Sequence, residues 1–335
     1  MNKKDDWIMT WTFKTKPVII AASSVGGPFE AKGPLASTFD QFFEKLDGGE
    51  KSFEKAQRRL MEDASIHALK KAELTNEKVD VFLAGDLINQ MTPTNFAART
   101  LSIPFIGLYN ACATSMAGFM TGAVLIDGGY ATNVLTAAAS HNAAVEKQFR
   151  YPTEYGGQKP PISQWTATAC GAAVLSSSGT GPYIHSATPG RVLDYGVTDP
   201  FNMGTAMAPA AADTIIRHVK NPEEYDCIIT GDLGKTGKQI FVKLLKDSGM
   251  NLSQTSMLDC GELLYGSEPQ VFSGGSGAGC SAAVTCGYIY GKMITKEWTR
   301  VLIAATGALL SPLSVLQKDS IPCIAHAVEL RMGEA

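Results

Sequence analysis

Cys112 is the residue whose type and position could best support chemistry. It lies in Asn110-Ala-Cys-Ala-Thr-Ser115, between an expected strand and an expected helix of small residues. Backbone N–H groups and the dipole at the start of a helix stabilise a thiolate or a bound anion. Most cysteines are simply small buried side chains, and we expect that role for Cys170, Cys227, Cys260, Cys280, Cys286 and Cys323. Cys112 is therefore the candidate nucleophile or ligand contact.

Three further candidates follow the expected strand Val134 to Ala138. His141 could donate a hydrogen bond to a ligand carboxylate or, equally, to the backbone, and Asn142 lies beside it. Arg150 can form a bidentate hydrogen bond with a carboxylate, although a surface charge near a loop is the alternative. Together with Cys112, these residues predict a site for a small acidic ligand.

Two glycine-containing segments add candidates from the second half of the chain. Gly231-Asp-Leu-Gly-Lys-Thr236 follows an expected strand, but a Walker A phosphate loop requires a glycine where this chain has Ile229. Ser273-Gly-Gly-Ser-Gly-Ala-Gly279 could cradle a phosphate, but a tight turn against the cysteine helix explains its glycines better. We take Gly231 and Ser276 as the ligand-binding candidates of these segments.

The elements that position these residues occur twice. Asp80-Val-Phe-Leu-Ala-Gly-Asp-Leu87 recurs as Asp226-Cys-Ile-Ile-Thr-Gly-Asp-Leu233, and Asn133 to Ser140 resembles Arg300 to Gly307. An apolar run bounded by glycine is typical of a buried parallel strand. Two matches in the same order predict an α/β protein made of duplicated halves, which we place at residues 1–178 and 179–335.

The remaining pattern gives the expected elements. Strands are predicted at Val18 to Ala22, Val79 to Ala84, Phe105 to Tyr109, Val134 to Ala138, Ala172 to Ser176, Cys227 to Thr230 and Val301 to Ala305. Helices are predicted at Ser52 to Lys71, Ala111 to Asp127, Lys238 to Ser248 and Gly279 to Ile294. The segment Phe149 to Pro161, rich in Tyr, Pro and Gly, predicts a long loop that is either a functional lid or an insertion.

Composition excludes several classes of protein. A chain of 335 residues with 45% apolar and 18% charged residues can bury a large core, and a net charge of −3 disfavours nucleic acid as a partner. Lys3, Lys4, Asp5 and Asp6 precede any apolar stretch, so we expect no signal peptide. The uncharged stretch Val301 to Leu316 falls short of the roughly 20 apolar residues that cross a bilayer. Seven cysteines without a CxxC pair predict a reducing compartment and no zinc site.

The duplicated halves, the Cys112 turn and the glycine-rich segment resemble the thiolase superfamily, in particular β-ketoacyl-acyl carrier protein synthase III, over nearly the whole chain. The resemblance implies a layered αβαβα fold and a homodimer. In those enzymes the cysteine is acylated, and a histidine and an asparagine of the second half assist. This chain has Gly231-Asp-Leu-Gly234 where the histidine is expected and Ser276 where the asparagine is expected. We therefore expect a protein that is not an enzyme and needs no cofactor.

A second resemblance is to sporulation proteins of spore-forming Firmicutes within this superfamily. It rests on three segments, Val25-Gly-Gly-Pro28, Ser140 to Gly156 and Asp199-Pro-Phe-Asn-Met-Gly204. The resemblance implies non-catalytic binding of dipicolinic acid, pyridine-2,6-dicarboxylate, with or without calcium. It also implies a cytoplasmic protein held at the spore inner membrane by membrane proteins that load this ligand into the spore. Two alternatives stay open: an acyltransferase that uses Cys112 with His141 as its base, and a structural adaptor with an empty pocket.

Overall fold

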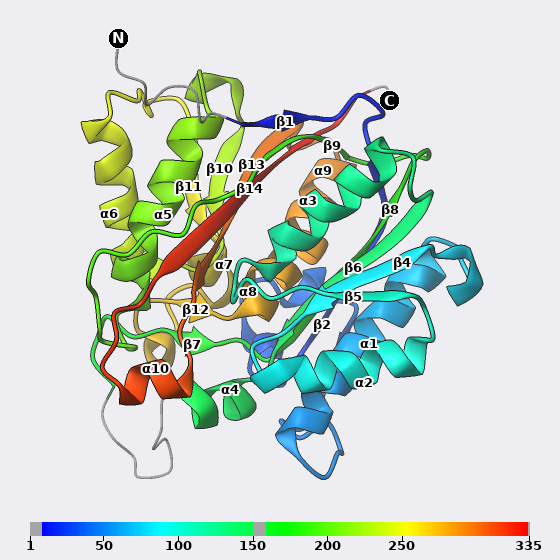
Figure 1. The fold of residues 1–335 in the computed structure, drawn as a ribbon, viewed down its shortest axis with the longest axis horizontal. Helices are drawn as coiled ribbons and strands as arrows, with labels where there is room; N and C mark the ends of the chain where they lie inside the picture. The colour runs from blue at the N-terminus through cyan, green and yellow to red at the C-terminus, as the bar shows by residue number, and fades with distance from the viewer. Residues whose placement is uncertain (1–8, 150–158, 334–335) are drawn as a thin grey trace.

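The computed structural model describes residues 9–149 and 159–333. Its centre is a large mixed sheet whose two halves repeat one strand order (Figure 1). The first half runs β5 (Phe105–Gly107), β4 (Val81–Gly85), β6 (Asn133–Ser140), β8 (Ala169–Ser176) and β2 (Val18–Gly26). The second half runs β11 (Ser256–Asp259), β10 (Cys227–Thr230), β13 (Arg300–Ala308), β14 (Cys323–Arg331) and β9 (Tyr183–Thr188).

Strand directions repeat as well. In each half the first three strands are parallel and the last two pairings are antiparallel. The halves join where Val18 of β2 pairs with Tyr183 of β9. Short strands complete the structure: β1 (Trp11–Thr12) pairs with β9, β3 (Gln41–Phe42) pairs with β2, and β7 (Trp165–Thr166) pairs with β12 (Gly275–Ser276). Because the two halves share one strand order and the same strand directions, the repeated sequence segments form equivalent strands.

Helices form one layer between the half-sheets and one outside each (Figure 1). The central layer contains α3 (Thr114–Asp127), which contacts β4 and β6 of the first half and β13 and β14 of the second, and α8 (Ala278–Val284). Neither helix has a charged residue before Asp127, which suits burial on all sides. The outer helices are α1 (Phe53–Lys71) and α2 (Thr92–Leu101) on the first half, and α5 (Met203–His218) and α6 (Gly234–Asp247) on the second. This is the predicted αβαβα arrangement.

The other helices are short: α4 (Asn142–Phe149), α7 (Cys260–Tyr265), α9 (Tyr290–Ile294) and α10 (Pro312–Leu316). The predicted elements are present with shifted ends, and the helix predicted from Gly279 is interrupted by a π-helical turn at Thr285–Ile289. Strand β14 and helix α5 were not predicted. Phe149 lies in α4 rather than in a loop, and residues 150–158 of the predicted loop lie outside the described residues.

Candidate functional site

Cys112 lies in a tight turn immediately before α3. Ala111 has a φ of 48°, a left-handed conformation that costs energy for a residue with a side chain. The Ala113 N–H donates to the Asn110 carbonyl (3.0 Å), and the Asn110 N–H donates to Thr114 Oγ1 (3.1 Å). These bonds hold the Cys112 side chain, which is 6% exposed, at the N-terminus of α3.

Residues of the second half of the chain pack against this turn and bond to it. A Cβ atom on Gly307 of β13 would lie 2.4 Å from the Asn110 carbonyl oxygen, so the close approach requires glycine. His326 of β14 accepts a hydrogen bond from the Gly190 N–H at Nδ1 (3.0 Å) and therefore donates from Nε2 to Asn110 Oδ1 (3.2 Å). Burial lowers the pKa of His326 to about 4, so the ring is neutral and positions Asn110.

Asp232 is the titratable group beside Cys112. Its buried carboxyl group accepts hydrogen bonds from Thr306 Oγ1 (2.6 Å) and the Gly277 N–H (3.0 Å), and also bonds the Cys112 side chain. Burial raises the pKa of Asp232 to about 7, and these hydrogen bonds oppose the rise. The site therefore holds a carboxyl group that is about half protonated near neutral pH.

A narrow pocket opens next to Cys112, between the two halves. Its walls are mainly apolar side chains, among them Leu87, Val145, Phe149, Met203, Ala308 and Leu310. Tyr109, Thr166 and Ser276 also line it, and no lysine or arginine lies among its described lining residues. Such a pocket suits a small, mainly apolar group that carries a polar end toward Cys112.

The structure brings Ser276 and Cys112 together in this pocket but corrects the expected place of His141. Successive side chains of a strand point to opposite faces. Ser140 points into the central layer, where its Oγ accepts from the Gly279 N–H (3.1 Å). His141 consequently points outward: Nε2 donates to the Leu46 carbonyl (2.8 Å), and the ring packs against Phe53.

Asn142 and Gly231 also lie away from the pocket lining. The Asn142 side chain donates to the Thr166 carbonyl (3.1 Å) and so fixes the start of α4. Gly231 allows close packing of β10 on β13, since a Cβ atom there would lie 2.9 Å from Ala305 Cα. Arg150 lies outside the described residues, and its role stays a prediction.

Sequence reasoning missed Asp232 as a site residue, although the repeat contained a signal for it. The Gly231-Asp232 pair corresponds to Gly85-Asp86 in the first half. Asp86 is also buried; burial raises its pKa to about 6, and Thr94 donates to it through both N–H and Oγ1. In this chain, the repeated Gly-Asp pair at the end of a buried strand marks a buried, hydrogen-bonded carboxyl group.

Neither a metal centre nor a bilayer-spanning helix is found within residues 9–149 and 159–333. No three or more His, Cys, Asp or Glu side chains gather there in a way that could hold a metal ion. Every helix there is too short or too polar to cross a bilayer.

Comparison with solved structures places the fold. The chain superposes on human mitochondrial 3-ketoacyl-CoA thiolase in complex with CoA with a TM-score of 0.61, at 10% identity, covering 96% of this chain and 100% of the thiolase. It superposes on 3-oxoacyl-[acyl-carrier-protein] synthase III from Aquifex aeolicus with a TM-score of 0.54, at 14% identity, covering 94% and 99% of the two chains. At these identities the similarity establishes the thiolase fold alone.

Comparison by sequence is more specific. The chain is 48% identical over 323 residues to stage V sporulation protein AD of Bacillus subtilis, covering 95% of each chain. The sequence profile of stage V sporulation protein AD matches residues 8–331. The fold, the turn at Cys112 and this match over nearly the whole length together show that the chain belongs to the stage V sporulation protein AD family.

Proposed function

We propose that this protein binds dipicolinic acid in the pocket beside Cys112, without chemical turnover, and that it belongs to the machinery that loads this acid into the developing spore. Membership of a sporulation family with a thiolase fold supports the setting. The observation that carries the ligand assignment is the narrow, mainly apolar pocket that both Cys112 and Ser276 line. Calorimetric titration of the purified protein with dipicolinate tests the proposal directly, and absence of heat at millimolar ligand would reject it.

The pocket fits the ligand in parts. A planar pyridine ring matches walls such as Leu87, Val145 and Leu310. One carboxylate beside Cys112 would meet Ser276 and the N-terminus of α3, where backbone N–H groups and the helix dipole favour negative charge. The second carboxylate needs a cation, and the described lining residues supply none.

Arg150 is the cation that we propose for the second carboxylate. It directly follows Phe149, which lines the pocket. We expect Arg150→Ala to weaken dipicolinate binding more than about tenfold, because a bidentate charge-assisted pair is lost. Calorimetry measures the effect, and Arg99→Ala, which removes an arginine of α2 outside the pocket, is the matched control. Unchanged affinity in Arg150→Ala would remove Arg150 from the site.

A condensing or acyl-transfer activity is the second candidate, because the Asp232 carboxyl group bonds the side chain of Cys112. His141 is not a suitable base, since its ring bonds the Leu46 carbonyl on the outer face of β6. The neutral His326 is committed to Asn110. We propose that Asp232 fixes the thiol for binding. Incubation with acyl-CoA followed by intact-mass measurement decides, since an acyl adduct on Cys112 would establish chemistry.

We further propose that two copies pair through the edge strand β5. This strand ends the sheet, and Ile106 on it is 49% exposed, with Phe96 and Tyr109 exposed nearby. An apolar strand edge invites pairing with another strand. We expect light scattering to give twice the chain mass of 35.6 kDa, and Ile106→Asp to shift the protein to monomer. Tyr130→Asp, at another exposed aromatic residue, should leave the dimer intact, and a monomeric parent would reject the proposal.

A further inference from the structure

A second pocket lies at the opposite end of the β13–β14 pair from Cys112. Ala308, which lines the Cys112 pocket, pairs with Cys323 at one end, and Arg300 pairs with Arg331 at the other. Eight residue steps along β13 separate these ends, roughly 26 Å. This second pocket, which we call the arginine pocket, is defined by Arg217, Lys220, Glu224, Arg300, Glu329 and Arg331 and encloses about 450 Å³.

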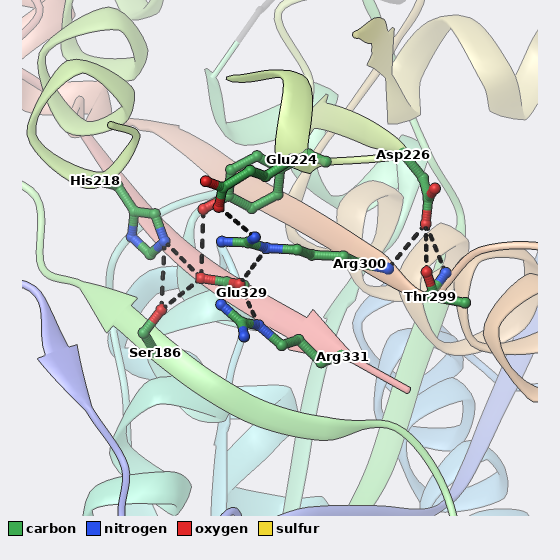
Figure 2. Close-up of polar contacts among 9 residues, drawn as sticks. Ser186, His218, Glu224, Asp226, Thr299, Arg300, Glu329 and Arg331 are labelled. Carbon is green, nitrogen blue, oxygen red and sulfur yellow. Dashed lines mark hydrogen bonds and ion pairs between the residues drawn. The ribbon is translucent and has the colours of Figure 1, made fainter. Parts of the chain in front are cut away.

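Glu329 lies at the centre of the polar contacts in the arginine pocket (Figure 2). Arg300 Nε donates to its carboxylate at 2.8 Å, Arg331 Nε at 2.6 Å and Ser186 Oγ at 2.8 Å. Burial opposes the negative charge of Glu329, but hydrogen bonds from His218, Arg331 and Ser186 and the charge of Arg300 outweigh it, so the pKa of Glu329 lies well below its usual range. The carboxylate is therefore ionised at every working pH and holds both guanidinium groups in place.

Both the backbone and the side chain of Arg300 are held by neighbouring residues. Its backbone N–H donates to Asp226 (2.9 Å), which also accepts from the Thr299 N–H. Its Nη1 pairs with Glu224 at 2.5 Å, and the guanidinium lies over the Tyr225 ring. These contacts hold the Arg300 guanidinium in one position, which pre-organises the pocket.

Two cations of the arginine pocket remain available to a ligand. Arg331 bonds Glu329 through its Nε alone, and its Nη atoms have no acceptor among the described residues. Lys220 has no ion-pair or hydrogen-bond partner for its side chain among those same residues. Arg217 is already paired with Asp213 at 3.0 Å. With Arg217 paired to Asp213, three cations, Lys220, Arg300 and Arg331, are left against the two carboxylates of Glu224 and Glu329. Both Lys220 and Arg331 line the pocket with N–H donors that no described residue uses.

We infer that the arginine pocket binds an oxyanion of the phosphate class, either on a small solute or on a phospholipid headgroup. The guanidinium of Arg331 presents paired N–H donors in a plane, and the ammonium of Lys220 adds a movable charge, a combination that suits phosphate oxygens. Thr10, Thr12 and His185 at the rim add polar groups. This site is independent of the dipicolinate pocket.

Titration of the full chain with inorganic phosphate, followed by phosphorus NMR line width, tests the inference. We expect binding by the parent protein that weakens at least about fivefold in Lys220→Gln, because one close charge pair is lost. Arg331→Lys should weaken it similarly, because the charge is kept while the planar fork is lost. Lys243→Gln, a lysine of α6 outside the pocket, is the matched control. No phosphate binding, or equal binding by the parent and Lys220→Gln, would overturn the inference.

Co-sedimentation with lipid vesicles distinguishes a phospholipid headgroup from a small phosphate solute. Co-sedimentation with phosphatidylglycerol vesicles that is lost in Lys220→Gln would assign the site to a lipid headgroup, with phosphatidylcholine vesicles as the neutral reference. We expect no such co-sedimentation, since an excess of one positive charge attracts a membrane surface weakly. Cys112→Trp should bind phosphate like the parent. That result would show that the two pockets act separately.

Discussion

Cys112→Trp should abolish dipicolinate binding, whereas Cys112→Ala should change the affinity only a few-fold. Cys112 borders the pocket, so an indole ring there fills the space that the pyridine ring needs. Alanine keeps the backbone N–H groups of the turn and removes one sulfur, which should cost at most about 1 kcal/mol of binding free energy. A covalent mechanism makes the opposite demand, because it requires the sulfur. Calorimetry with both variants therefore separates binding from catalysis at this residue.

Loss of folding in Cys112→Trp would imitate loss of binding, so a second variant is needed. Met203→Trp narrows the same pocket from the start of α5, at a residue that is only partly buried. Ile216→Trp places an indole at an exposed position of the same helix and is the matched control. Thermal unfolding of each variant reports whether it folds. Parent-like binding by both Cys112→Trp and Met203→Trp would move the site elsewhere.

Local sequence was sufficient for the repeat and for Cys112. The segments beginning at Asp80 and Asp226 are apolar runs closed by glycine, a pattern that favours a buried parallel strand. Their equivalence predicts that the two halves share one plan, and both halves have the same strand order. The helix after Cys112 has small and apolar residues on every side, which indicates a central layer. Position at a strand-to-helix turn follows from these local features.

Contacts between distant segments decided the rest. Strand β14 was not predicted because His326 and Glu329 interrupt its apolar pattern, and their partners Asn110 and Arg300 come from elsewhere in the chain. His141 was expected in the pocket, but one residue of strand alternation turns it to the outer face. The burial of Asp232 depends on Thr306, which is 74 residues away along the chain.

Dipicolinate binding should weaken roughly tenfold between pH 6 and pH 8, and Asp232→Asn should remove this dependence. The ligand is a dianion across this range, so a negative charge bonded to the Cys112 side chain repels it. Asp232, with a pKa of about 7, is mostly protonated at pH 6 and mostly ionised at pH 8. If the pocket accepts the dianion only with Asp232 protonated, the affinity falls with the protonated fraction. Calorimetry at several pH values in both proteins measures the difference.

Neighbouring groups set the controls for this experiment. Burial also raises the pKa of Asp259, which accepts from Thr230 Oγ1 next to the site, whereas His326, with a pKa of about 4, stays neutral above pH 6. Both remain in Asp232→Asn, so the difference between the proteins isolates Asp232.

Thermal stability gives a second readout of Asp232. Because folding raises the pKa of Asp232 from 3.8 to about 7, its protonation favours the folded state at low pH, and that contribution is lost as pH rises from about 4 through 7. Asp232→Asn should therefore unfold at temperatures that fall less between pH 6 and pH 8 than those of the parent. An unchanged pH profile of binding in a variant whose stability profile has flattened would show that Asp232 titrates but does not face the ligand.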